Sequence, residues 1–240
     1  MCMQQRGTWF IWLPVSVLGA CTLPTHSVRH TLTFAEADGG SYSRTAATFI
    51  QGRAGIGFSA GGPRANFGSI DKLVADDDPP GGVEEDPSDG GFSSLTRILV
   101  AFPDVVGPNP GQVPPHATIH RATLTLKTLD ANYAEAIPPP LTVHQVLTGW
   151  DESTVTWESF HHGGVPGRDY VKSPVASFQP SHEDTYYTID ITSTVQRWVD
   201  GEAPLGLIII RDHADVAAFF SDDHPSIENR PKLAAEFSAR

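Results

Sequence analysis

The feature that most constrains the fold is a series of short strand-like segments. The clearest is 117–129, where the run Ala122-Thr-Leu-Thr-Leu-Lys127 alternates apolar and polar residues and so predicts a strand with one face in a core and the other toward solvent. Further strand-like segments lie at 31–36, 46–51, 95–102, 141–147, 154–157, 171–178, 185–191, 205–211, 216–221 and 232–237. No βαβ alternation accompanies them. The pattern therefore predicts an all-β fold, a jelly-roll-like antiparallel β-sandwich with one short helix.

Turn-forming residues support this class, because the chain contains 22 glycines and 20 prolines. The expected helix lies within residues 190–201, where Val195, Trp198 and Val199 are spaced i, i+3 and i+4. Thr192 is its expected N-cap, and Gly201 follows its expected end. The run Ile208-Ile-Ile210 is apolar throughout, which predicts a strand covered on both faces.

Two stretches are expected to stay outside the core. Residues 75–91 carry seven acidic side chains, and residues 104–116 are rich in proline. Such segments are too polar or too interrupted by proline to pack inside a domain. We expect a single β-sandwich domain over residues 31–240, with an acidic loop at 75–91.

The N-terminal segment predicts export and lipidation. Residues 1–20 contain Arg6 and then an apolar run that is too short to span a bilayer. The run ends in Leu18-Gly-Ala-Cys21, which resembles the lipobox of bacterial lipoproteins. We expect residues 1–20 to be a signal peptide, Cys21 to be lipidated, and residues 21–30 to be a spacer. In a bacterium with two membranes, Thr22 favours the outer membrane or cell surface, since it is not the aspartate that signals inner-membrane retention.

The cysteine content limits the disulfide bonds that the chain can form, and the net charge limits its binding partners. Cys2 would leave with the signal and Cys21 would carry lipid, so no disulfide is expected. The net charge is −12, and loss of Arg6 would leave 15 basic residues against 28 acidic ones. Nucleic acid is not an expected partner, because binding to phosphate requires a basic surface. Membrane lipid and a polysaccharide are the expected partners.

Two sets of residues are candidates for ligand or ion binding. Tyrosine rings can stack on sugars when exposed, although burial is the alternative for each. The tyrosine candidates are Tyr133, Tyr170, Tyr186 and Tyr187. The acidic loop could hold Ca²⁺, which takes six to eight oxygen ligands, or could simply be solvated. Its candidate ligands are Asp76, Asp77, Asp78, Glu84, Glu85 and Asp86. No cofactor is expected to be required.

No pattern predicts a catalytic centre. Gly57-Phe-Ser-Ala-Gly61 matches the G-x-S-x-G motif but is not followed by a helix-forming sequence. Acidic residues cluster near Trp150 and Trp157, yet we expect both rings to pack in or near the core and Glu152 to make a local hydrogen bond. Neighbouring His and Asp residues at 161–162, 212–215 and 222–224 lack the spacing of a metal site.

A family resemblance covers about residues 40–238. The stretch Thr148-Gly-Trp-Asp-Glu-Ser-Thr-Val-Thr-Trp157 is its most specific part. The supporting segments are 66–69, 96–100, 117–127, 141–146, 189–198, 206–209, 220–222 and 230–233. In these segments the chain resembles the DNRLRE-type domain. The resemblance implies a jelly-roll β-sandwich of bacterial and archaeal surface proteins, often attached to polysaccharide-degrading enzymes. Some members bind carbohydrate, including alginate.

The sequence therefore predicts a lipid-anchored, non-catalytic β-sandwich that binds carbohydrate or another envelope component. One alternative is a purely structural or adhesive surface protein. A second alternative is a polysaccharide lyase or glycosidase built on a jelly roll. The strong negative charge disfavours an anionic ligand such as alginate.

Overall fold

A computed structural model describes residues 28–36, 42–53, 61–77, 95–129, 140–212 and 216–239. The predicted signal peptide, Cys21, Ser59 and most of the acidic loop lie outside these residues. The described elements are β1 (His30–Phe34), β2 (Ala46–Arg53), η1 (Gly62–Arg64), β3 (Lys72–Asp77), β4 (Leu95–Ala101), β5 (Thr118–Lys127), β6 (Leu141–Gln145), β7 (Ala176–Phe178), β8 (Tyr186–Asp190), α1 (Thr192–Val199), β9 (Leu207–Ile210), β10 (Ala217–Phe220), η2 (Ile227–Asn229) and β11 (Lys232–Ser238).

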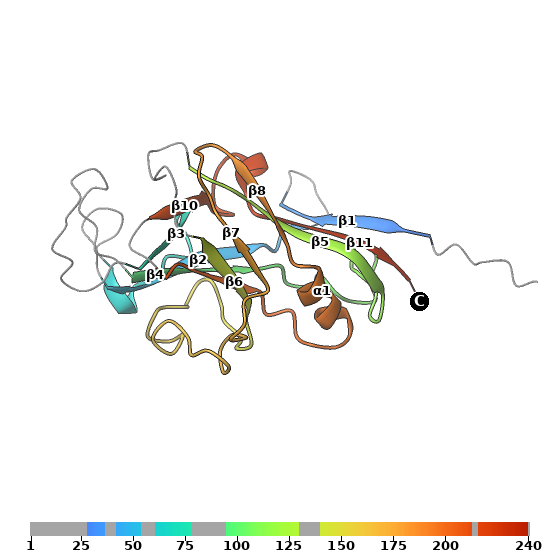
Figure 1. The fold of residues 1–240 in the computed structure, drawn as a ribbon, viewed down its shortest axis with the longest axis horizontal. Helices are drawn as coiled ribbons and strands as arrows, with labels where there is room; N and C mark the ends of the chain where they lie inside the picture. The colour runs from blue at the N-terminus through green and yellow to red at the C-terminus, as the bar shows by residue number, and fades with distance from the viewer. Residues whose placement is uncertain are drawn as a thin grey trace, which may run out of the picture.

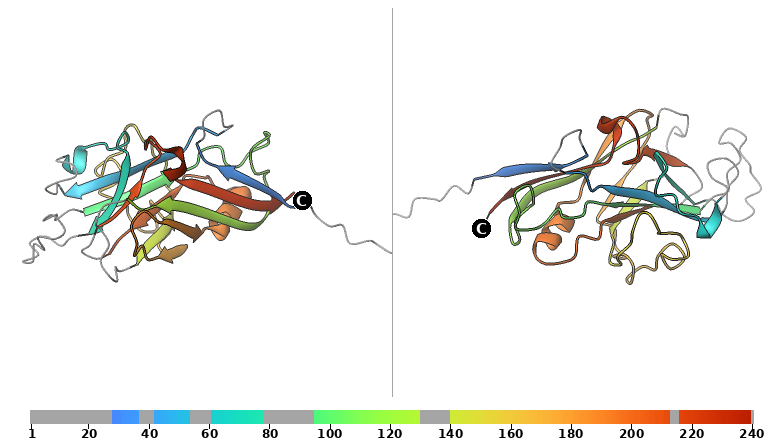
Figure 2. Two further views of the ribbon diagram at one scale, coloured as in Figure 1. Left: turned by 90° about the horizontal axis from the view of Figure 1, so that it is seen from above. Right: turned by 180° about the vertical axis from the view of Figure 1, so that it is seen from behind.

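The described strands form two antiparallel sheets. The four-stranded sheet has the order β1-β11-β5-β8. The seven-stranded sheet has the order β10-β3-β4-β9-β6-β7, and β2 pairs with β4. Figure 1 and Figure 2 show β1, β5 and β11 side by side, with α1 packed against β5. This arrangement confirms the predicted all-β sandwich with one short helix.

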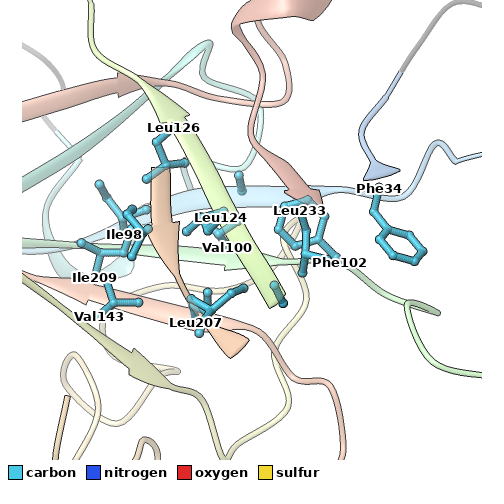
Figure 3. Packing of buried hydrophobic residues seen from close by; sticks show 14 of the residues in the cluster. Phe34, Ile98, Val100, Phe102, Leu124, Leu126, Val143, Leu207, Ile209 and Leu233 are labelled. Atoms are coloured by element: carbon cyan, nitrogen blue, oxygen red, sulfur yellow. The ribbon is translucent and has the colours of Figure 1, made fainter. Parts of the chain in front are cut away.

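The main core lies between the two sheets (Figure 3). Leu124 and Leu126 of β5 are at most 1% exposed and face Ile98 and Ile209 of the opposite sheet. Lys127, on the other side of β5, is only partly buried. The alternation in the sequence therefore predicted correctly which side of β5 enters the core.

A second apolar cluster covers the outer face of the seven-stranded sheet. The sheet contributes Ile50, Leu99, Ile208 and Ile210. Residues 146–170 contribute Val146, Val155, Trp157, Phe160 and Tyr170. This covering segment, coloured yellow in Figure 1, lies on the side of β4 and β6 away from β1, β5 and β11. Because Ile209 belongs to the main core and its two neighbours to the second cluster, the prediction of a strand covered on both faces is confirmed.

Helix α1 matches its sequence pattern except at its start. Val195, Trp198 and Val199 are buried, as expected. The N-cap is Ile191, not Thr192, and it makes no capping hydrogen bond through its side chain. Instead, the backbone N–H of Thr192 donates to a carboxylate oxygen of Asp190 at 2.8 Å.

Gly201 follows α1 with a φ of +117°, a conformation that favours glycine, so its predicted place after the helix is correct. Within the described residues, no helix is long and apolar enough to cross a membrane.

Two strand predictions, one within the covering segment and one just after it, are wrong. Residues 154–157 form no strand, and strand β7 begins at Ala176, five residues later than the expected start at 171. The sequence predicts a strand over 154–157, but Val155 and Trp157 pack on the sheet without pairing in it. Trp157 is 7% exposed through this packing alone.

Two expected loops contribute to the core, which corrects a second set of predictions. Strand β3 includes the start of the acidic stretch, and Ala75 within it is fully buried. In the proline-rich stretch, Val105 and Val113 are also fully buried. Val113 donates its N–H to the carbonyl of Val105 at 2.9 Å, so this loop satisfies its own backbone while its valines fill the core.

Candidate functional site

The outer face of the four-stranded sheet is a polar surface that we call the open face. Its side chains point away from the core because they alternate with buried residues along each strand. They are Tyr186, Thr188 and Asp190 of β8, Arg121, Thr125 and Lys127 of β5, Lys232, Ala234 and Glu236 of β11, and Thr31 and Thr33 of β1. The pairing sets them in rows: Tyr186 opposes Lys127, and Thr188 opposes Thr125, which opposes Lys232.

Tyr186 is the exposed aromatic side chain of the open face. It is 48% exposed, and its hydroxyl donates to the carbonyl of Glu228 at 3.1 Å. The ammonium nitrogens of Lys127 and Lys232 lie 5.2 Å and 5.9 Å from its ring centroid. These contacts hold the ring in one orientation, since a cation is attracted to an aromatic face. A held and exposed ring can stack on an apolar surface of a ligand at little cost in side-chain entropy.

The charges on the open face are largely paired with each other. The Lys127 ammonium lies 2.5 Å from the Asp184 carboxylate, and that hydrogen bond raises the pKa of Lys127. Arg29 pairs with Glu236 at 2.6 Å. Hydrogen bonds from Thr192 lower the pKa of Asp190, with a smaller contribution from Arg121. The open face therefore presents fixed donors and acceptors of both signs, although the chain as a whole is acidic.

A groove of about 660 Å³, which we call the edge groove, opens beside β8. It lies between β7, β8 and α1 and shares Thr188 and Asp190 with the open face. Its other lining residues are Ile119, Val175, Ala176, Ser177, Phe178, Ile189, Thr192, Ser193 and Gln196. This mixture suits a ligand with both hydroxyl groups and apolar C–H surfaces, because ligand sites combine an apolar lining with a few polar groups.

A smaller groove of about 440 Å³ lies at the other end of α1. Its polar side chains bind one another: Arg197 donates to the side chain of Gln145 at 2.7 Å, and Gln145 donates to Glu202 at 2.7 Å. Leu147, on its rim, is 41% exposed. Since its donors and acceptors are already used internally, this groove offers fewer of them to a ligand than the edge groove does.

The four tyrosines predicted as stacking platforms do not come together. Tyr186 lies on the open face, whereas Tyr187 is half-buried and its hydroxyl accepts from the N–H groups of Ser181 and His182. Tyr170 is 5% exposed and packs edge-on against His144, so its ring is not presented at the surface. Tyr133 lies outside the described residues.

The predicted calcium ligands fall mostly outside the described residues, which exclude Asp78, Glu84, Glu85 and Asp86. Asp76 is fully buried within β3, and Asp77 ends that strand. In the described part of the chain, no three acidic, histidine or cysteine side chains are already grouped so as to hold a metal ion.

The tryptophan-rich stretch behaves largely as expected. Trp157 is buried in the second apolar cluster, and the Trp150 indole N–H donates to the carbonyl of Leu205 at 3.0 Å. Glu152 does not make the expected local hydrogen bond with its side chain. Its carboxylate accepts instead from the N–H of Ala47, 105 positions away, at 2.7 Å.

Sequence reasoning missed several polar members of the open face and the edge groove, such as Lys232, Thr188 and Asp190. The alternation within residues 117–129 and 185–191 carried part of this information, because the side opposite the core must hold them. It could not show that the polar sides of β5, β8 and β11 form one surface.

Comparison with known families identifies the family to which the chain belongs. The two sheets, with a polar outer face and an adjoining groove, define the chain as an antiparallel β-sandwich module. Residues 109–236 match carbohydrate-binding module family 96, and this match spans more than half of the chain, which therefore belongs to that family. No curated protein matches the chain. The matched region contains β5, β8, α1 and nearly all of β11, and thus the whole edge groove.

Proposed function

We propose that the chain is a lipid-anchored, non-catalytic cell-surface protein whose β-sandwich binds carbohydrate through the open face and the edge groove. The observation that carries the proposal is the exposed Tyr186 ring, on the same strand as residues that line the edge groove, within the region that matches a carbohydrate-binding module family. Tyr186 and Asp190 are four residues apart on β8, which corresponds to about 13 Å along an extended strand. A glycan lying along β8 could contact both.

The side chains at the two ends of β8 support a glycan that lies along this strand. At one end, the Tyr186 ring offers an apolar plane for the C–H face of a sugar. At the other, the hydroxyls of Ser177 and Thr188 and the carboxylate of Asp190 can exchange hydrogen bonds with sugar hydroxyls. Strand β8 carries the Tyr186 ring as well as Thr188 and Asp190 of the edge groove, so both kinds of group lie along one strand.

The binding proposal is tested with the full-length protein in detergent on a glycan array, followed by titration of the best glycan. Replacing Tyr186 by alanine should weaken binding about tenfold, because a buried aromatic anchor commonly contributes more than 1 kcal/mol. Leu147→Ala is the matched control, since Leu147 is similarly exposed but lines the other groove. Loss of binding in Leu147→Ala alone would move the site to that groove. No binding to any glycan at millimolar concentration would rule out a carbohydrate-binding function.

The anchor is tested separately. The lipobox-like Leu18-Gly-Ala-Cys21 supports lipidation at Cys21, and two or more acyl chains give stable attachment. In the native host, Cys21→Ser should move the protein from the membrane fraction to the soluble fraction, and the mass of the wild-type N-terminus should include the lipid. A wild-type protein without lipid would contradict the anchor while leaving the glycan test unaffected.

A further inference from the structure

Strand β8 forms one free edge of the four-stranded sheet. Among the described strands, it pairs only with β5. Its sequence, Tyr186-Tyr-Thr-Ile-Asp190, is rich in aromatic and β-branched residues and contains neither lysine nor proline, the residues that commonly protect a sheet edge. An edge of this kind presents backbone groups to which another strand can be added.

The hydrogen bonds to β5 show which backbone groups of β8 are already used. The N–H of Ile191 donates to the carbonyl of Ala122 at 2.9 Å, and the N–H of Thr128 donates to the carbonyl of Thr185 at 3.0 Å. Hydrogen-bonded pairs alternate with non-bonded pairs along an antiparallel ladder. The odd-numbered residues of 185–191 therefore bind β5 through their backbone, and the even-numbered residues do not.

The backbone N–H and carbonyl groups that point toward the free edge belong to Tyr186, Thr188 and Asp190, and they are placed symmetrically about Thr188. Thr188 is the middle residue of β8, with Tyr186 and Asp190 two positions away on either side. A second copy of β8 that runs antiparallel, related by a two-fold axis beside Thr188, would offer the same groups in matching positions. Each facing pair would exchange two hydrogen bonds.

The side chains at the edge suit this pairing as well. Thr188 would face Thr188 of the second copy, and threonines that face each other across two strands are a favourable pair. Asp190 of one copy would lie beside Tyr186 of the other, whose ring centroid is 5.2 Å from the Lys127 ammonium. The edge groove also places the apolar side chains of Val175 and Phe178 beside β8, where a second strand can cover them.

We propose that β8 pairs with β8 of a second copy of the chain, so that two four-stranded sheets form one continuous sheet. A two-fold axis perpendicular to this sheet puts both open faces on the same side. A glycan on the open face would extend from one copy to the other, whereas a glycan inside the edge groove would compete with the second copy. The pairing requires neither the glycan nor the lipid anchor, so it goes beyond the proposed function.

The test exchanges charges at Thr188, because this exposed residue would face its own equivalent across the two-fold axis. The full-length wild-type protein in detergent should sediment as a dimer in analytical ultracentrifugation at about 100 μM. Thr188→Lys and Thr188→Asp should each weaken dimerisation about tenfold or more, since like charges would face each other. An equimolar mixture of the two variants should restore the dimer, since opposite charges then meet.

Thr33→Lys is the matched control, because Thr33 is exposed on β1, the other edge strand of the same sheet. It should leave the wild-type dimer intact. If the charged variants do not fold, Thr188→Cys provides a second measurement in native membranes. Mild oxidation should link two copies of Thr188→Cys, since facing residues of a hydrogen-bonded pair are about 5.5 Å apart between Cα atoms, a distance that a disulfide spans. The wild type and Thr33→Cys should stay unlinked.

Three results would overturn the proposal. A wild-type protein that is monomeric at that concentration does not form the pair. A dimer that persists in both charged variants at Thr188, or that the mixture of the two fails to restore, uses another surface. A dimer lost only in Thr33→Lys pairs through β1 instead. Each of these results leaves the glycan array unaffected, and an array without any bound glycan leaves the sedimentation test unaffected.

Discussion

The two sheets differ in what lies on their outer faces. On the seven-stranded sheet, Ile50, Leu99 and Ile208 point outward and are covered by Trp157 and its neighbours in the second apolar cluster. On the four-stranded sheet, the corresponding positions are threonines and charged residues around Tyr186, and they form the open face. A strand that is apolar on both sides therefore requires a cover, whereas an alternating strand leaves one side available for a ligand.

The covering segment is held on the sheet without strand pairing. The Asp169 side chain is fully buried and accepts hydrogen bonds from the N–H of Val165 at 2.7 Å and the hydroxyl of Thr148 at 2.9 Å. Burial alone would raise the pKa of Asp169, but these donors and the Arg168 guanidinium hold it well below its usual range. Gly163 has a φ of +88°, and a Cβ there would lie 2.4 Å from the Trp157 ring.

The largest expected loss of stability comes from removing the central side chain of the covering segment. Trp157→Ala should destabilise the protein by about 3–5 kcal/mol, because it leaves a cavity over the sheet. Urea unfolding measures the loss. A loss below about 1 kcal/mol would mean that the covering segment unfolds independently of the sandwich.

The next largest loss of stability is expected from weakening the hydrogen bonds to Asp169 in the covering segment. Asp169→Asn should cost about 2–3 kcal/mol, since it weakens several hydrogen bonds to a buried charge. Because the folded-state pKa is low, the stabilisation is present above the unfolded pKa and is lost only as pH falls through strongly acidic values. The difference between variant and wild type in urea is therefore measured at pH 7.5, where the Asp169 carboxyl is ionised in both the folded and the unfolded state. Glu183→Gln, at an exposed position, is the control.

A smaller loss of stability is expected from removing the contact that Arg97 of the sheet makes with the covering segment. The Arg97 guanidinium lies 5.3 Å from the Trp157 ring centroid and donates to the carbonyl of Gly163 at 2.7 Å. Arg97→Met keeps most of the side-chain volume and should cost about 1–2 kcal/mol. Hydrogen exchange should accelerate in residues 155–164 and stay unchanged in β5. Equal acceleration in both would show that Arg97 supports the whole sandwich.

The smallest effect belongs to the open face. Thr125→Ala should change the free energy of unfolding by no more than about 0.5 kcal/mol, because surface substitutions away from special contacts are nearly neutral. Chemical denaturation checks this. A cost above 1.5 kcal/mol would show that another part of the chain covers this face and would remove it as a candidate site.

The elements that sequence patterns predicted correctly are those whose burial follows local periodicity. Strand β5, the apolar run of β9 and the buried stripe of α1 are of this kind. Strand β3 was missed because its acidic end looked like a loop, although Asp76 is fully buried. The alternating residues 154–157 predict a strand, but alternation does not reveal whether a segment pairs in a sheet or only packs on it.

The candidate sites were less predictable than the fold. Tyr186 could be named from sequence as an aromatic residue, but its exposure and the burial of Tyr170 were decided by the sheet edge and by the covering segment.

By itself, the sequence determined the class of fold and the inward side of its clearest strands, since backbone geometry converts a period of two or 3.6 into a face. Only the tertiary structure decided which outer face is covered and which aromatic ring reaches solvent. These outcomes depend on where long turn-rich segments pack after the strands have paired, and no local pattern encodes that position.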